Sequence, residues 1–253
     1  MNTAARDPRR LPAWAVGLLA ILAVAVLVSV LWRPWSTPAA MVAAGADDAA
    51  GAAIVPEPID LPDDPTVLVF GDSWTFGSAA SLPSLGYAYV VTELTGWTTV
   101  VDGVRGSGYL KPGVDGPAFG PRIAALDPAL APDLIIVQGS INDRRLHPVG
   151  YRDAVTAAWD ALTRTYPDAT IVILGPAPQV LPVEAATAAI DRDLAELAAQ
   201  RGWWYLSPIA EAWITSENYL DVIDTGVGRN HPSTDGHRYL AERLAAAIAL
   251  ISR

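Results

Sequence analysis

Two residues far apart in the sequence have the chemistry of a nucleophile and its general base. Ser73 closely follows the apolar stretch Thr66–Phe70, in the segment VFGDSW, and a helix start is expected after it. A serine held at the end of a buried strand, beside backbone N–H groups, is well placed to attack a carbonyl carbon. His231 lies in GRNHPSTDGH, and imidazole is the side chain best suited to proton transfer near neutral pH. Taken alone, Ser73 is also compatible with an ordinary turn or N-cap.

Two further loops carry groups that can donate hydrogen bonds to a reacting oxygen. VDGVRGSGYL places Gly106 among closely spaced glycines, where a backbone N–H can be reached without a side chain in the way. IVQGSINDRR places Asn142 after another apolar stretch, and the Asn side-chain amide can donate to a developing oxyanion. Each loop alone also fits a simple turn. We expect the other two histidines, His147 and His237, to be catalytically inert.

The elements that must position these residues alternate along the chain. Short apolar stretches and amphipathic stretches follow one another after Pro65, which is typical of strands joined by crossover helices in a parallel sheet. The predicted strands are Thr66–Phe70, Thr98–Asp102, Leu134–Gln138, Thr170–Leu174 and Trp203–Leu206. The predicted helices are Tyr87–Leu94, Arg122–Leu126, Tyr151–Tyr166, Val183–Arg201 and Gly236–Ile251. Residues 64–253 are therefore predicted to form one three-layer α/β domain, with ligands bound where the strand-following loops meet.

The N-terminal residues predict a membrane anchor. The 22 residues 11–32 carry no charge and, as a helix, would span about 30 Å, the thickness of a bilayer's hydrocarbon core. Three arginines precede this stretch and one follows it, so the positive-inside rule places residues 1–10 in the cytoplasm and the domain outside. The alternative is a cleaved signal peptide, whose apolar region is normally shorter. In that case the domain is secreted.

Residues 33–63 are predicted to tether the domain to the anchor. They are rich in Ala, Pro, Gly and Asp and show neither helical nor strand periodicity. The segment IVPEPIDLP within them is apolar enough for a second interpretation, in which part of the tether lies against the folded domain.

Charge and cysteine content exclude several classes of protein. The formal net charge is -10, with 27 acidic and 17 basic residues, and no basic face that could bind nucleic acid is visible. The chain has no cysteine, which excludes disulfides, thiolate nucleophiles and cysteine metal sites. Its 253 residues are 51% hydrophobic, enough for one core of ordinary domain size.

Together, the four loop segments resemble one family in its own order of motifs: the SGNH (GDSL-like) hydrolases. The matching residues are GDS at 71–73, Gly106 in GVRGSGY, Asn142 in SINDRR and His231 in HPSTDGH. The resemblance implies that Ser73 is the nucleophile and His231 the general base. It implies an oxyanion hole made by the Ser73 and Gly106 N–H groups and the Asn142 side chain. It also implies a five-stranded parallel sheet of flavodoxin-like order, and ester hydrolysis through an acyl-enzyme without metal or organic cofactor.

Three positions depart from the family's pattern. Trp74 stands where leucine is usual, which we expect to change the neighbouring packing or a pocket wall. Ser140 stands where the third motif usually has glycine, and Gly139 lies one position earlier. Gly228 stands three residues before His231, where the family normally carries the Asp that orients the histidine.

The missing Asp leaves two predicted alternatives for the group that orients His231. Asp224 could reach back to the ring if the segment 226–228 loops, or a backbone carbonyl of the same segment could hold the ring in a Ser–His dyad. Asp221 and Asp235 are weaker candidates, since Asp235 is better explained as a cap for the last helix.

The expected substrate is a short acyl ester, with an O-acetyl group on an envelope glycan or lipid as the leading candidate. The predicted location and nine tryptophans, whose faces can stack on sugars or line acyl pockets, favour such a substrate. Two other functions remain open. A catalytically weak or silent module that binds a glycan or a protein is favoured by the glycine at position 228. An acyltransferase would use the same residues as a hydrolase.

Overall fold

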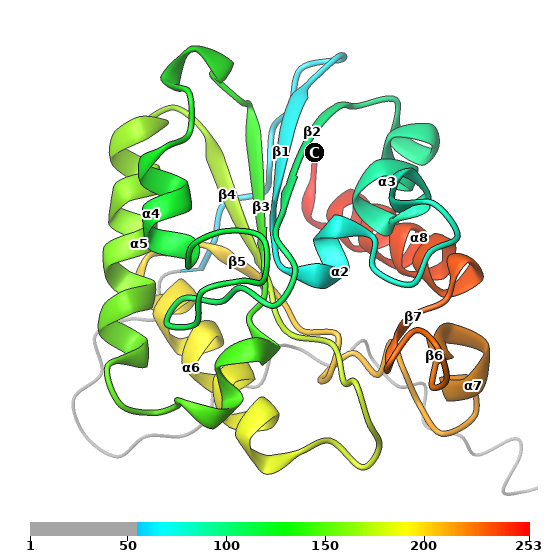
Figure 1. Cartoon of the computed structure of the whole chain (residues 1–253). Coiled ribbons are helices and arrows are strands. Elements are labelled where there is room, and N and C mark those ends of the chain that lie inside the picture. Colours follow the sequence, from blue (N-terminus) through cyan, green and yellow to red (C-terminus); the bar gives the residue numbers. More distant parts are fainter. Residues whose placement is uncertain (1–54) are drawn as a thin grey trace, which may run out of the picture. The chain divides into compact units, whose positions relative to one another are not determined.

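The computed structural model describes residues 55–253, and its centre is a sheet of five parallel strands (Figure 1). The strands are β1 (Thr66–Gly71), β2 (Thr98–Gly103), β3 (Leu134–Gln138), β4 (Thr170–Leu174) and β5 (Trp204–Leu206). Their order in the sheet is β2-β1-β3-β4-β5, which is the flavodoxin-like order. The predicted three-layer α/β class with a five-stranded parallel sheet is confirmed, and four of the five strands begin at the residue predicted.

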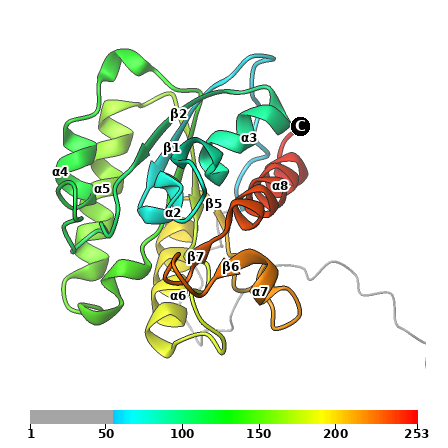
Figure 2. The ribbon, with the colours of Figure 1, turned by 45° about the vertical axis from the view of Figure 1, so that its right-hand side comes forward.

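Helices cover both faces of the sheet, as the two views in Figures 1 and 2 show. The principal helices are α3 (Tyr87–Thr95), α4 (Phe119–Ala124), α5 (Tyr151–Thr165), α6 (Ala185–Gln200) and α8 (Thr234–Ile251). α3 and α8 pack on one face, against residues such as Val67 and Val69 of β1. α4, α5 and α6 pack on the other face, against Leu68 and Phe70. Because both faces are buried, β1 is a continuous apolar stretch instead of an alternating one.

Four short elements near the carboxyl edge of the sheet show no periodicity in the sequence, although a helix start was expected after Ser73. They are α2 (Ser73–Phe76), α7 (Tyr219–Val222) and the antiparallel pair β6 (Ile223–Asp224) and β7 (His231–Pro232). Helix α4 begins at Phe119, three residues before the predicted start, because Phe119 and Ile123 are both buried in the core below it. Elements of two to four residues contain too little sequence for a helical or strand period to show.

The folded domain extends beyond the predicted boundary at residue 64. The Ile59 N–H donates to the Ile251 carbonyl (2.8 Å), the Arg253 N–H donates to the Ile59 carbonyl (2.9 Å), and the Ile59 side chain is 2% exposed. The end of the predicted tether therefore packs on the domain, because Ile59 gains apolar burial there. The predicted anchor, residues 11–32, lies outside the described residues. Within residues 55–253, no helix is both long and apolar enough to cross a bilayer.

Candidate active site

Ser73 and His231 meet at the carboxyl edge of the sheet, although 158 positions separate them. The Ser73 Oγ lies 2.9 Å from the His231 Nε2. Ser73 begins α2 just after β1, which lies between β2 and β3 in the sheet, and His231 lies in β7, just before α8. Rigid elements therefore hold both side chains, and the predicted juxtaposition of hydroxyl and imidazole is present in the structure.

The second nitrogen of the imidazole faces a backbone carbonyl. The His231 Nδ1 lies 2.8 Å from the Gly228 oxygen, and the His231 N–H donates to the same oxygen at 3.2 Å. A carbonyl oxygen can only accept, so Nδ1 must carry the proton of the neutral ring. Nε2 is then left with its lone pair directed at Ser73. This tautomer is the one that a general base for Ser73 requires.

Of the two predicted alternatives, the structure contains the backbone carbonyl, and Asp224 makes no hydrogen bond to the His231 ring. Its Oδ1 accepts a hydrogen bond from the Gly226 N–H (2.8 Å), even though Asp224 pairs with His231 across the β6–β7 ladder. A Cβ atom at Gly228 would lie 2.7 Å from both the Asp224 Cβ and the Ala79 Cβ. The position that carries an Asp in the family therefore has no room for a side chain here. Asp235, one of the weaker candidates for orienting His231, lies in the first turn of α8.

The side-chain amide of Asn142 lies between the loops that carry the other two predicted oxyanion donors. Its Nδ2 is 2.9 Å from the Ser107 carbonyl oxygen and 3.3 Å from the Asp72 Oδ2. Ser107 follows Gly106, whose positive φ of 74° favours glycine, and Asp72 precedes Ser73. The residues predicted to form an oxyanion hole are thus on neighbouring segments.

Asp72 is a buried carboxyl group beside the nucleophile. Its Oδ1 accepts the Trp74 N–H (2.9 Å) and so caps the N-terminus of α2. Burial raises the pKa of Asp72 to about 7, and the Trp74 N–H and the Arg122 charge oppose this rise only in part. The site therefore contains a carboxyl group that titrates near neutral pH.

Arg122 joins the ends of β1 and β2 to the glycine loop. Its Nη1 donates to the Gly71 carbonyl and the Ser107 hydroxyl (2.9 Å each), and its Nη2 donates to the Asp102 carbonyl and carboxylate (2.7 Å each). The guanidinium also lies 4.1 Å from the centre of the Phe70 ring. Since these partners flank Ser73 and Gly106, Arg122 acts as a positioning residue.

Asp143 holds the far end of the same glycine loop. Its carboxylate accepts the N–H groups of Tyr109 (2.7 Å), Leu110 (3.2 Å) and Lys111 (2.9 Å), as well as the Ser140 hydroxyl. A Cβ at Gly108 would lie 2.5 Å from the carboxylate oxygens, so glycine permits this approach. Burial raises the pKa of Asp143, while these hydrogen bonds oppose the rise. Ser140, the departure from the family's third motif, is one of its partners.

Sequence reasoning missed the roles of Arg122 and Asp143. A charged residue between buried Phe119 and Ile123 in FGPRIA was the available signal for Arg122. A buried charge needs hydrogen-bonding or oppositely charged partners, but the sequence alone does not identify them.

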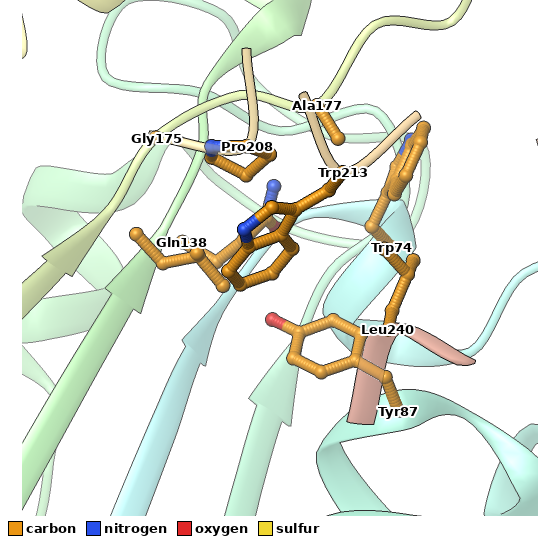
Figure 3. A pocket seen from close by; sticks show the side chains of 9 residues that line it. Trp74, Tyr87, Gln138, Gly175, Ala177, Pro208, Trp213 and Leu240 are labelled. Carbon is orange, nitrogen blue, oxygen red and sulfur yellow. The ribbon is translucent and has the colours of Figure 1, made fainter. Parts of the chain in front are cut away.

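Trp74 forms one wall of a small apolar cavity (Figure 3). The cavity measures about 20 Å³, room for one water molecule or methyl group, and Trp74, Tyr87, Trp213 and Leu240 are among its lining residues. In Figure 3 the Trp213 indole lies between Gln138 and Trp74. Trp74 is 2% exposed and belongs to the core cluster on the α3–α8 face, so the tryptophan that stands in place of leucine is part of the packing as well as of a pocket wall.

The other two histidines have structural roles. The His237 Nδ1 accepts the Tyr87 N–H (3.2 Å), and its Nε2 donates to the Ser78 carbonyl (3.0 Å). His147 pairs with Asp193 at 2.7 Å. In the described part of the chain, no cluster of three or more His, Asp or Glu side chains is arranged to hold a metal ion.

Comparison with known proteins gives a consistent family match. The sequence model of the GDSL-like lipase/acylhydrolase family matches residues 69–239. The GDSL lipase Rv0518 of Mycobacterium tuberculosis is 29% identical over 199 residues, which cover 73% of this chain and 81% of that protein.

Solved structures share the fold. The aryl esterase of M. smegmatis superposes with a TM-score of 0.54 at 16% identity, and Est24, a carbohydrate acetylesterase from Sinorhizobium meliloti, with 0.56 at 15%. Each match covers 74% of this chain and 99% of the other chain.

Proposed function

The chain belongs to the GDSL-like lipase/acylhydrolase family and is an ester hydrolase, and on this premise we propose that Ser73 and His231 perform the reaction as a catalytic dyad. The observation that carries the proposal is the 2.9 Å contact between the Ser73 Oγ and the His231 Nε2, with Nδ1 held by the Gly228 carbonyl. A hydroxyl group bonded to an oriented imidazole is the arrangement that activates serine.

The geometry leads to a two-step reaction. Ser73 Oγ attacks the ester carbonyl carbon while its proton passes to His231 Nε2, and the resulting imidazolium donates from Nδ1 to the Gly228 oxygen. The Ser73 and Gly106 N–H groups and the Asn142 amide donate to the tetrahedral oxyanion. Asn142 must then turn one N–H away from its present partners. His231 returns the proton to the leaving alcohol, and water activated by the same ring hydrolyses the acyl-enzyme.

The proposed substrate is a short acyl ester, with an O-acetyl group on a glycan or lipid as the first choice. The fold shared with a carbohydrate acetylesterase supports this class. The proposed location is outside the cytoplasm, on a membrane anchor formed by residues 11–32, and the uncharged stretch of 22 residues supports it. Protease accessibility of the domain in intact cells tests the location.

Serine-specific labelling tests the proposed dyad. The full chain in detergent is treated with a fluorophosphonate probe and assayed with p-nitrophenyl acetate, beside Ser73→Ala and the control Ser81→Ala, a nearby exposed serine. We expect wild type and Ser81→Ala to be labelled and active, and Ser73→Ala to lose both properties. Labelling that persists in Ser73→Ala would place the nucleophile elsewhere.

A catalytically silent binding module is the second candidate, and it is favoured because no carboxylate of residues 55–253 bonds the His231 ring, whose Nδ1 faces the Gly228 carbonyl. A wild-type protein that neither reacts with the probe nor hydrolyses the ester would support this candidate. An acyltransferase would be labelled like a hydrolase but would produce a new ester when a second alcohol is added, so product analysis separates the two.

A further inference from the structure

The only lysine in the chain lies at the proposed oxyanion hole. The chain has 17 basic residues, and the other 16 are arginines. The Lys111 Nζ is 3.8 Å from the position that a Cβ on Gly106 would occupy. Gly106 is one of the proposed oxyanion donors, so this ammonium group lies within a few ångströms of the place where the ester carbonyl would bind.

The backbone of Lys111 is held firmly at this place. Its N–H donates to the buried carboxylate of Asp143 (2.9 Å), and its carbonyl accepts the Gly108 N–H (2.8 Å). The starting point of the flexible side chain is therefore fixed relative to Gly106. The ammonium itself remains solvent-accessible, because the residue is exposed.

Lys111 has no carboxylate partner within the described residues, in contrast to nearby Arg105, which pairs with Asp115 at 2.6 Å. Two other exposed cations, Arg145 and Arg229, likewise form no ion pair with a described residue. Arg145 lies on the loop of Asn142, and Arg229 lies on the loop of His231. Unpaired positive charge thus occurs on all three loops that carry these site residues.

The Lys111 charge is opposite in sign to that of the whole protein. The formal net charge of -10 repels anions on average, so an unpaired cation beside Gly106 has the opposite effect locally. The Lys111 charge also reaches the interior of the site, since it favours the ionised form of Asp72 and so lowers the pKa of that group.

We propose that Lys111 forms an anion-binding subsite beside Gly106 and that the natural ester carries a carboxylate or phosphate group close to the scissile bond. The inference rests on the proposed function and narrows its substrate class. The ammonium group pairs with that anion and orients the ester carbonyl towards the Gly106 N–H. Because Lys111 is exposed, its contribution is expected to be about fivefold in kcat/KM.

A matched pair of esters tests the subsite. 3-Acetoxybenzoate and its methyl ester differ by one negative charge and have the same acyl group. We expect the ratio of their kcat/KM values, anionic over neutral, to fall about fivefold in Lys111→Met, chiefly through KM. Lys111→Arg should keep the ratio. Arg164→Met removes another exposed cation without an ion pair among the described residues, on α5, and should leave the ratio as in wild type.

Other kinetic outcomes overturn the proposal. An unchanged ratio in Lys111→Met would show that the charge does not select anions. An equal loss with both esters would show that the ammonium acts on the oxyanion and not on a substrate anion.

A second measurement does not depend on turnover. Because Lys111 is the only lysine, reductive methylation modifies this side chain and the N-terminal amine alone, and mass spectrometry separates the two. We expect 3-hydroxybenzoate to protect Lys111 from methylation and its methyl ester not to protect it. Protection should persist in Ser73→Ala, whose loss of hydrolysis tests the proposed function separately. Absence of protection overturns the subsite, even if the enzyme is active.

The same assay distinguishes the source of the anion. Protection by glucuronate indicates an acidic sugar, and protection by glycerol 3-phosphate indicates a phospholipid headgroup.

Discussion

The Nδ1 atom of His231 donates its proton to the carbonyl oxygen of Gly228, 2.8 Å away, where a serine hydrolase triad would place a carboxylate. A neutral carbonyl holds the ring in the correct tautomer as well as a carboxylate does. It stabilises the imidazolium less, because it carries only a partial negative charge. Orientation is therefore retained, while part of the electrostatic assistance is absent.

Replacing Asp224 should have little effect on catalysis. We expect Asp224→Asn to keep kcat/KM for p-nitrophenyl acetate within about threefold of wild type, because Asp224 contacts Gly226 and not the imidazole. If Asp224 were the Asp of a catalytic triad, the same replacement would lower kcat about 10⁴-fold. Asp168→Asn, at an exposed turn, is the control. A loss of a thousandfold or more in Asp224→Asn would restore this residue as the orienting acid.

Removing the Asn142 amide should slow the chemical step. Its Nδ2 is the only side-chain donor proposed for the oxyanion, and loss of one such donor costs about 10²–10³ in kcat. We expect Asn142→Ala to show this loss in kcat with a much smaller change in KM. Stopped-flow measurement of the acylation burst checks the effect. A change confined to KM would assign Asn142 to substrate binding.

Stability should fall as the pH rises from about 4 to about 7, because Asp72 keeps its proton in the fold over this range. In the unfolded chain this carboxyl ionises near pH 3.8, whereas burial raises its pKa in the fold to about 7. Between these values the folded state binds the extra proton, so the free energy of unfolding decreases with rising pH, by up to about 4 kcal/mol. Urea unfolding of wild type and Asp72→Asn from pH 4 to 8 measures the difference. Parallel curves would show that Asp72 is ionised throughout.

The buried imidazole of His237 should have the opposite effect. Burial lowers the pKa of His237 from 6.5 to about 4. Below pH 6.5 the unfolded chain therefore binds a proton at this residue, whereas the folded chain does not. The free energy of unfolding therefore falls by up to about 3 kcal/mol between pH 6.5 and 4. His237→Gln should lose this dependence in the same unfolding series. If the variant and wild type respond equally to acid, His237 is protonated within the fold.

Replacing Arg122 should lower both the free energy of unfolding and kcat. Its removal leaves the Asp102 carboxylate and two carbonyl oxygens without their donor, and breaking such a pair costs about 3–5 kcal/mol. We expect Arg122→Met to lose this amount in urea unfolding and to lower kcat at temperatures where it stays folded. Arg122→Lys should recover part of both.

The control for Arg122 is a surface ion pair. Arg238 meets Glu93 at 3.4 Å with both side chains more than half exposed, so Arg238→Met should cost less than about 1 kcal/mol. Equal losses in the Arg122 and Arg238 variants would contradict the positioning role.

The alternation of apolar and amphipathic stretches was sufficient to predict the sheet. A strand such as Leu134–Gln138, buried on both faces, shows itself as a continuous apolar run between turn residues. The resemblance to the SGNH order of motifs implied that Ser73 and His231 would act together, although 158 positions separate them. The first inference depends on residue types within local segments, and the second depends on short motifs recognised in their order.

Only the tertiary structure decided which group orients His231 and which residues hold the glycine loop. Every residue has a carbonyl, so the sequence does not distinguish the Gly228 oxygen from any other, and the choice depends on how the β6–β7 turn folds. Arg122, Asp143 and Ile59 likewise have partners distant in sequence. Local periodicity reports which face of an element is buried, but the identity of a hydrogen-bond partner is set by three-dimensional proximity.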